Sequence, residues 1–168
     1  LVSNLYSELG WQKQKAEALN DTKLRSTILS LACYSEKPEV IAEALAQYAS
    51  FENIAAMPAD TRHILLAMAV KHGKKNDFES LFAAYPKEIN AELQQDICGA
   101  LSTTKDPENI AKILRNLTNP DFVRLQDVDR WIVYLLRNRW SRQAAWDWLT
   151  SNWHWIEENF ASDKSYDN

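Results

Sequence analysis

The side chains that most often do chemistry are few and scattered in this chain. None of the three histidines, His63, His72 and His154, lies in a His-Glu-x-x-His motif or at metal-ligand spacing from a cysteine. His154 stands near Glu157 and Glu158 and could form an acid–base pair, although a lone histidine among surface carboxylates is usually solvated. No glycine-rich phosphate loop and no nucleophile beside a base is present. The sequence therefore predicts no catalytic residue and no metal-ligating residue.

Composition and charge limit the classes of partner. The chain has 168 residues, of which 46% are hydrophobic and 25% charged, and its formal net charge is −4. These proportions are ordinary for a folded domain, whereas an acidic net charge does not suit a protein whose main task is to grip a phosphate backbone. No apolar run approaches the roughly 18 residues of a membrane-spanning helix. We therefore expect no nucleic-acid partner and no membrane partner.

The two cysteines, Cys33 and Cys98, lie inside apolar helical runs and lack the spacing of metal ligands. Isolated apolar cysteines of this kind are usually small buried thiols. We therefore expect two small buried thiols in a protein of a reducing compartment.

One apolar pattern recurs four times, starting at Leu24, Thr61, Leu93 and Val128, which stand 37, 32 and 35 residues apart. Within each half of a copy the apolar positions follow one another after three or four residues, which is the period of an amphipathic helix. The matching positions in the four copies are Ile28, Leu65, Ile97 and Ile132; Ala32, Ala69, Leu101 and Leu136; Ile41, Phe78, Ile110 and Ala145; and Leu45, Phe82, Leu114 and Leu149. This repeat length is typical of helical-pair repeats of the tetratricopeptide and HEAT kind.

Each copy is divided by a short break that favours a turn between two helices. The breaks span residues 35–38, 73–76, 103–107 and 138–141. Asp106 followed by Pro107 is a clean start signal, since aspartate caps a helix and proline suits its first turn. Asn76 and Ser141 are candidate starts in the second and fourth copies. Gly10 similarly predicts the end of a leading helix.

These patterns predict an all-α protein in which antiparallel helix pairs stack as a HEAT/armadillo-like solenoid, an α-α superhelix. A single pair cannot bury its apolar stripe, whereas four stacked pairs share one continuous core. We expect one domain, made of a leading helix and connector at 1–20, helix pairs at about 21–50, 58–85, 90–118 and 127–160, and a polar tail at 161–168.

Six of the seven tryptophans lie between residues 127 and 160. Trp148 falls on the core stripe of its helix, so packing is its expected role. Trp131, Trp146 and Trp153 could stack between helices or line a groove for a peptide, and packing is the more usual role. If Trp146 is packed, its replacement by alanine should cost about 3–5 kcal/mol. Because an exposed aromatic end is a liability, we expect further polypeptide to pack there, and a start in mid-helix without methionine also suits a piece of a longer protein.

Arg25 and Arg62 each follow the first residue of a copy and could form a ladder that faces a groove, together with Trp131. Gln94 and Asp129 take the matching positions in the later copies, so the ladder is not continuous. The simpler interpretation is a helix-surface arginine paired with a neighbouring carboxylate.

Three linked motifs stand out in the second half of the chain: Val123-Arg124-x-Gln126-Asp127, Leu135-Leu136-Arg137-Asn138, and Ala145-Trp146-x-Trp148-Leu149-x-x-Asn152-Trp153. Together they resemble the C-terminal helical domain of the aminopeptidase N family, whose members are zinc metalloaminopeptidases of the gluzincin type. The earlier stretches Leu24-Arg25, Leu29-x-Leu31-Ala32-Cys33 and Met57-Pro58-Ala59-Asp60-x-Arg62 are similar to the same domain, and Asp163-Lys164-Ser165-Tyr166 is similar to bacterial members. The resemblance marks seven family-motif residues as structural: Arg124, Gln126, Asp127, Asn138, Trp146, Asn152 and Trp153.

One departure from the family pattern is visible. Many members have glycine in the turn after Asn138, where this chain has Arg139-Trp140-Ser141. The departure leaves the geometry of that turn open.

The resemblance implies a non-catalytic part of a cytoplasmic bacterial zinc aminopeptidase that releases N-terminal amino acids from peptides. In the family this domain caps the active site and gates or contacts the distal part of the substrate. The family's zinc ligands lie in an upstream catalytic domain, so zinc is implied for the parent enzyme and this fragment alone should be inactive. The implied partners are that catalytic domain and peptide substrates. The residues alone also allow an alternative, a free-standing helical-repeat scaffold for protein–protein interaction.

Overall fold

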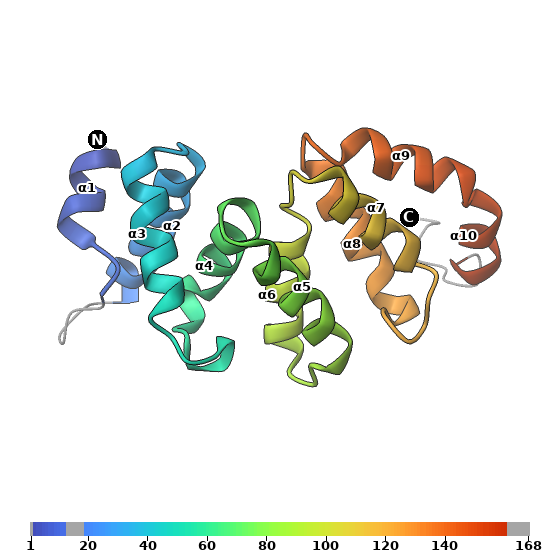
Figure 1. The fold of residues 1–168 in the computed structure, drawn as a ribbon, viewed down its shortest axis with the longest axis horizontal. Coiled ribbons are helices and arrows are strands. Elements are labelled where there is room, and N and C mark those ends of the chain that lie inside the picture. Colours follow the sequence, from blue (N-terminus) through green and yellow to red (C-terminus); the bar gives the residue numbers. More distant parts are fainter. Residues whose placement is uncertain (1, 13–18, 161–168) are drawn as a thin grey trace. The chain divides into compact units, whose positions relative to one another are not determined.

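The computed structural model describes residues 2–12 and 19–160, and every regular element in these ranges is a helix (Figure 1). The predicted all-α class is therefore confirmed. Expectations for residue 1, for the connector at 13–18 and for the polar tail at 161–168 lie outside the described residues. The helices are α1 (Val2–Leu9), α2 (Leu19–Tyr34), α3 (Pro38–Ala49), α4 (Ala59–His72), α5 (Lys75–Ala84), α6 (Ala91–Leu101), α7 (Pro107–Asn116), α8 (Val128–Arg137), α9 (Arg142–Ser151) and α10 (Trp153–Phe160), with short 3₁₀ turns η1 (Ile54–Ala56), η2 (Tyr85–Lys87) and η3 (Leu125–Asp127).

Each of the four predicted breaks coincides with a gap between two helices, although α3, α5 and α7 begin inside the predicted ranges, at Pro38, Lys75 and Pro107. The cap predicted at Asp106 is confirmed, because its carboxylate Oδ1 accepts a hydrogen bond from the Glu108 amide at 2.8 Å and Pro107 occupies the first turn. Gly10 ends α1 with a backbone φ of +54°, a conformation that side chains with a Cβ seldom adopt. Local start and stop signals thus fix the lengths of these helices.

Replacing Asp106 by alanine is expected to lower the free energy of unfolding by about 1 kcal/mol, because the Glu108 amide loses its acceptor. Urea unfolding of the variant measures the loss. Asp106→Asn is the matched control, since an asparagine side chain can accept the same hydrogen bond. Equal losses in the two variants would contradict a capping role.

Two other predicted start signals act differently. α5 begins at Lys75, so the start predicted at Asn76 is wrong. The carboxylate of Asp77 accepts from the Lys74 amide at 2.6 Å and holds the first turn instead. Ser141 does stand just before α9, but its hydroxyl donates to the Leu135 carbonyl at 2.7 Å and caps no amide of the first turn.

The chain forms two compact units, Leu1–Leu101 and Ser102–Asn168. In the first unit α4 packs against α2, α3, α5 and α6, and it buries Leu65 and Leu66 almost completely. In the second unit α9 packs against α7, α8 and α10, and Leu135 and Ala145 lie in its core. The boundary falls within the third predicted helix pair, so the stacking of four pairs as one solenoid stays a prediction.

The repeat positions predicted to form the core are buried or half-buried throughout, from Ile28 to Leu149. Leu24, the first residue of the first copy, is the exception among the start positions because it is 41% exposed. The predicted second helix of the last pair is divided into α9 and α10. At the division the amide and the side-chain Nδ2 of Asn152 both donate to the Trp148 carbonyl, at 3.0 Å and 2.7 Å.

Candidate functional site

Arg25 and Arg62 are held inside the first unit. The Nε of Arg25 donates to the carbonyl oxygens of Leu9 at 3.2 Å and Gly10 at 3.1 Å, and the residue is 2% exposed. Arg25 therefore ties α2 to the end of α1. The acceptors are backbone carbonyl groups, whereas the simpler interpretation from the sequence was that a carboxylate side chain pairs with the arginine.

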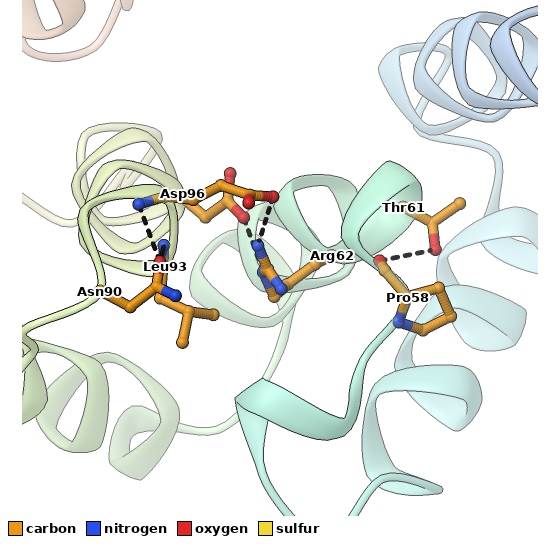
Figure 2. A network of polar contacts seen from close by, with 7 residues as sticks. Pro58, Thr61, Arg62, Asn90, Leu93 and Asp96 are labelled. Carbon is orange, nitrogen blue, oxygen red and sulfur yellow. Dashed lines mark hydrogen bonds and ion pairs between the residues drawn. The ribbon is translucent and has the colours of Figure 1, made fainter.

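Arg62 joins α4 to α6 through two carboxylates (Figure 2). Its Nε lies 2.7 Å from Asp96 Oδ2, and its Nη2 lies 2.8 Å from Glu92 Oε1. The Arg62 side chain is 7% exposed, the Asp96 side chain 16% and the Glu92 side chain 65%. The predicted arginine–carboxylate pairing is confirmed here, and its Asp96 half is largely shielded from water.

The start of α6 is fixed beside this pair. The Asn90 side chain accepts hydrogen bonds from the amides of Glu92 at 3.0 Å and Leu93 at 3.1 Å, as Figure 2 shows for Leu93. The asparagine cap places Glu92 and Asp96 on the side of α6 that meets Arg62.

The groove-facing hypothesis for Arg25, Arg62 and Trp131 is wrong for this structure. Trp131 is 0% exposed, and its ring centroid lies 5.8 Å from that of Phe122. Both arginines are buried as well. Side chains with no exposed surface cannot line an open groove, and the packing interpretation of Trp131 is confirmed.

Two family-motif residues organise the chain around η3. Arg124 donates through Nε to Asp127 Oδ2 at 2.7 Å. Asp127 is 6% exposed, and Arg130 approaches its other oxygen at 3.7 Å. Gln126 is exposed. The Arg124–Asp127 contact thus fixes the entry into α8.

Asn138 organises the turn between α8 and α9. Its Nδ2 donates to the carbonyls of Ser102 at 3.0 Å and Thr104 at 2.8 Å, and its Oδ1 accepts from the Trp140 amide at 3.1 Å. Ser141, the last residue of the Arg139-Trp140-Ser141 turn, has a φ of −104° and is fully buried. The turn therefore needs no left-handed residue at position 141.

The aromatic residues of α9 and α10 divide into two groups. Trp148 is half-buried and meets Trp155 edge to face, with ring centroids 6.4 Å apart. Trp146 and Trp153 are 54% and 52% exposed, so the prediction that they pack is wrong for the described chain. Trp146 stands one residue after buried Ala145, and one step rotates a side chain by about 100° around the helix.

Three exposed basic side chains lie at the end of α8, in the turn after it and at the start of α9. Arg137, Arg139 and Arg142 are exposed, and the guanidinium of Arg139 lies 4.9 Å from the Trp140 ring centroid. Sequence reasoning missed this grouping. The signal that could have found it is the run Arg137-Asn138-Arg139-Trp140-Ser141-Arg142, which holds no acidic residue.

The histidines do not converge. His154 is exposed and pairs with Glu158 at 3.0 Å one turn along α10, as expected for a solvated pair. His63 is exposed and His72 half-buried on α4. Within residues 2–12 and 19–160 no three His, Cys, Asp or Glu side chains form a group that could hold a metal ion. No helix in the same ranges is long and apolar enough to cross a membrane.

Cys33 is a buried free thiol on α2, as predicted. Burial raises the pKa of the Cys33 thiol to about 11 from 9.0; Lys71 opposes the shift and Glu43 adds to it. The folded protein therefore favours the protonated thiol.

Alkylation of Cys33 at pH 8 is expected to be on the order of 100-fold slower in the folded chain than in the denatured chain, because the thiolate is the reactive form. Folding stabilises the protonated form, so the contribution of Cys33 to stability is complete below pH 9 and is lost as the pH rises toward about 11. Urea unfolding between these pH values, with Cys33→Ala as the control, measures the loss. A pH dependence unchanged in Cys33→Ala would contradict the assignment.

Comparison with known proteins gives a consistent group of relatives. The model of the ERAP1-like C-terminal domain matches residues 1–168. Aminopeptidase N of Lactococcus lactis subsp. lactis (strain IL1403) is 36% identical over 169 residues, which are 99% of this chain and 20% of that protein. Aminopeptidase N of Lactobacillus helveticus is 30% identical over 168 residues, again 99% of this chain and 20% of the relative. Glutamyl aminopeptidase of Bitis rhinoceros is 23% identical over 161 residues, or 95% of this chain and 17% of the relative.

Proposed function

The chain belongs to the ERAP1-like C-terminal domain family, and from this premise we propose that it is a non-catalytic helical domain of a zinc-dependent aminopeptidase. The parent enzyme would release N-terminal amino acids from peptides in the cytoplasm. The observation that carries this proposal is the match of nearly the whole chain to aminopeptidases that are about five times longer, since the chain spans 20% of their length.

The proposed role of the domain is to cap the active site and to gate or contact the distal part of the peptide. Such a role needs a body that keeps its shape when substrate binds. The Arg62 pair between α4 and α6 and the Asn138 contacts in the second unit are fixed polar links that support it. If the helix pairs stack as a solenoid, the domain would offer an extended concave surface for this task.

The described residues do not provide a site suited to zinc. The three histidines are separated, and the described residues contain no group of His, Cys, Asp or Glu suited to a metal. We propose that the zinc of the parent enzyme is bound by residues outside this chain, and we assign no step of hydrolysis to a described residue.

The test is hydrolysis of an amino-acid p-nitroanilide by three proteins: the 168-residue chain, the full-length gene product, and that product lacking residues 1–168. We expect that the 168-residue chain does not hydrolyse the p-nitroanilide, with or without added zinc, and that the full-length product does. Removing the domain should change the dependence of the rate on peptide length, measured with peptides of three to twelve residues.

Two outcomes would contradict this proposal. Hydrolysis by the 168-residue chain would require a catalytic site within it. A full-length product without peptidase activity would instead favour the alternative, a helical-repeat scaffold whose exposed Trp146 and Trp153 receive a protein.

A further inference from the structure

The turn between α2 and α3 has an unusual backbone conformation at Glu36. This residue has a φ of +52°, and among residues 2–12 and 19–160 it is the only one besides glycine with a positive φ. Its amide donates to the Cys33 carbonyl at 3.1 Å, so Glu36 occupies the left-handed position that follows many helix ends. Glycine is favoured at such a position, because a Cβ makes the conformation costly. Glutamate instead brings a charged side chain to this turn.

The Glu36 carboxylate lies at the end of α4. Its Oε1 is 3.9 Å from Lys71 Nζ and 3.9 Å from His72 Nε2. The side chain of Glu36 is 35% exposed, that of Lys71 23% and that of His72 16%, so solvent and salt screen these charges only in part. One carboxylate oxygen therefore faces two basic groups on the last turn of α4.

The two basic groups differ in the pH at which they carry charge. Lysine is protonated throughout the neutral range, whereas imidazole ordinarily titrates near about pH 6.5. Lys71 therefore attracts Glu36 throughout this range, and His72 adds a second positive charge only after it binds a proton. His72 is also the last residue of α4, where the helix dipole favours a cation. Lys71 opposes the proton on His72, since it brings a like charge to the same oxygen.

Other titratable groups surround this contact on the elements that pack against α4. Carboxylic acids ordinarily titrate below about pH 5, and thiols, phenols and lysines above about pH 8. Burial raises the pKa of the Cys33 thiol to about 11, further from the neutral range. These groups are Tyr34 and Cys33 on α2, Lys37 in the turn, Glu39, Glu43 and Tyr48 on α3, Lys74, Lys75 and Asp77 at the start of α5, and Glu92 and Asp96 on α6. Imidazole is thus the group type around this contact that changes its charge between about pH 5.5 and 7.5.

We propose that Glu36, Lys71 and His72 form a pH-responsive latch, in which protonation of His72 tightens the contact between the α2–α3 turn and α4. Lys71 holds the carboxylate at neutral pH, and the imidazolium adds its attraction as the pH falls. The coupling is reciprocal, because a carboxylate that is attracted by the imidazolium also favours the proton on His72. All three residues lie in the first unit, so the latch does not depend on the proposed function.

Titration of the three histidines by nuclear magnetic resonance tests the coupling in the 168-residue chain. Glu36→Gln removes the negative charge and keeps the length of the side chain, so the titration midpoint of His72 should fall by about 0.5 pH unit or more. His63 and His154 are exposed internal controls, and their midpoints should move by less than about 0.1 unit. An unchanged His72 midpoint in Glu36→Gln, or a His72 that stays neutral down to pH 5, would overturn the latch.

Amide hydrogen exchange measures the effect of the latch on the turn. The amides of Ser35 and Glu36 donate to carbonyls of α2, and their protection factors are corrected for the direct effect of pH on exchange. We expect these protection factors to be about threefold higher at pH 5.5 than at pH 7.5. His72→Gln should abolish the difference. His63→Gln, which removes an exposed histidine from the same helix, should retain it.

A further variant, Glu36→Gly, separates the charge of Glu36 from its backbone conformation. Glycine adopts a positive φ without strain, so this variant should fold with the turn intact. Its protection factors should no longer differ between pH 5.5 and 7.5. A difference that survives in Glu36→Gly, or one that His63→Gln removes as completely as His72→Gln, would assign the pH dependence to other groups and overturn the proposal.

Discussion

Replacement of Trp131 by alanine is expected to lower the free energy of unfolding of the 168-residue chain by about 3–5 kcal/mol. Trp131 is 0% exposed and packs against Phe122, with ring centroids 5.8 Å apart. Removing the indole deletes a large apolar group and leaves a cavity that α8 and η3 fill only in part. Urea unfolding followed by far-ultraviolet circular dichroism measures the loss without depending on tryptophan fluorescence.

Trp146→Ala in the same chain is the matched control. Trp146 is 54% exposed, so the same chemical change should cost less than about 1 kcal/mol. The structure thereby reverses the expectation from the sequence, which assigned the large loss to Trp146. Equal losses at the two positions would mean that Trp146 is buried in solution.

Replacement of Arg62 by alanine is expected to cost about 2–4 kcal/mol. The guanidinium contacts Asp96 at 2.7 Å and Glu92 at 2.8 Å, and its removal leaves the Asp96 carboxylate, 16% exposed, without this cation. The Glu92 side chain is 65% exposed and water can replace its contact, so this half of the pairing adds little. Most of the loss comes from Asp96, which keeps its charge in a shielded position.

Two variants separate this effect from the loss of any surface arginine. Arg115→Ala removes an exposed arginine of α7 and should change stability by less than about 0.5 kcal/mol. Arg62→Ala combined with Asp96→Ala should recover part of the loss, because the stranded carboxylate is removed as well. If Arg62→Ala costs no more than Arg115→Ala, the link between α4 and α6 is not a source of stability.

The helices could be predicted from the sequence because their signals are local. The spacing of apolar residues by three or four positions, the Asp106 cap and Gly10 each act within a few residues of where they stand. All four breaks therefore lie within one or two residues of their predicted positions. The errors in the predicted helix limits are small and have local causes. Asp77 instead of Asn76 holds the start of α5, and the last predicted helix is divided at Asn152, whose backbone φ of −107° and ψ of 17° depart from the helical conformation.

The family resemblance could also be predicted from the sequence. The motifs that end in Asn138 and in Asn152-Trp153 follow one another along the chain. The structure explains two of these residues as side chains that bind backbone carbonyls. Asn138 reaches Ser102 and Thr104, and Asn152 reaches Trp148. Their conformational roles are specific to asparagine, which carries donor and acceptor on a short side chain.

What the sequence determined by itself is most of the helices, their approximate limits and their apolar faces, because each depends on residues within one or two turns. Only the tertiary structure decided which large side chains are buried. Arg25 and Arg62 turn inward to partners 15 and 34 residues away, and Trp131 is enclosed while Trp146 is not. The physical reason is that burial depends on the neighbour that a helix face meets, and a residue at the edge of an apolar stripe can lie on either side of that contact.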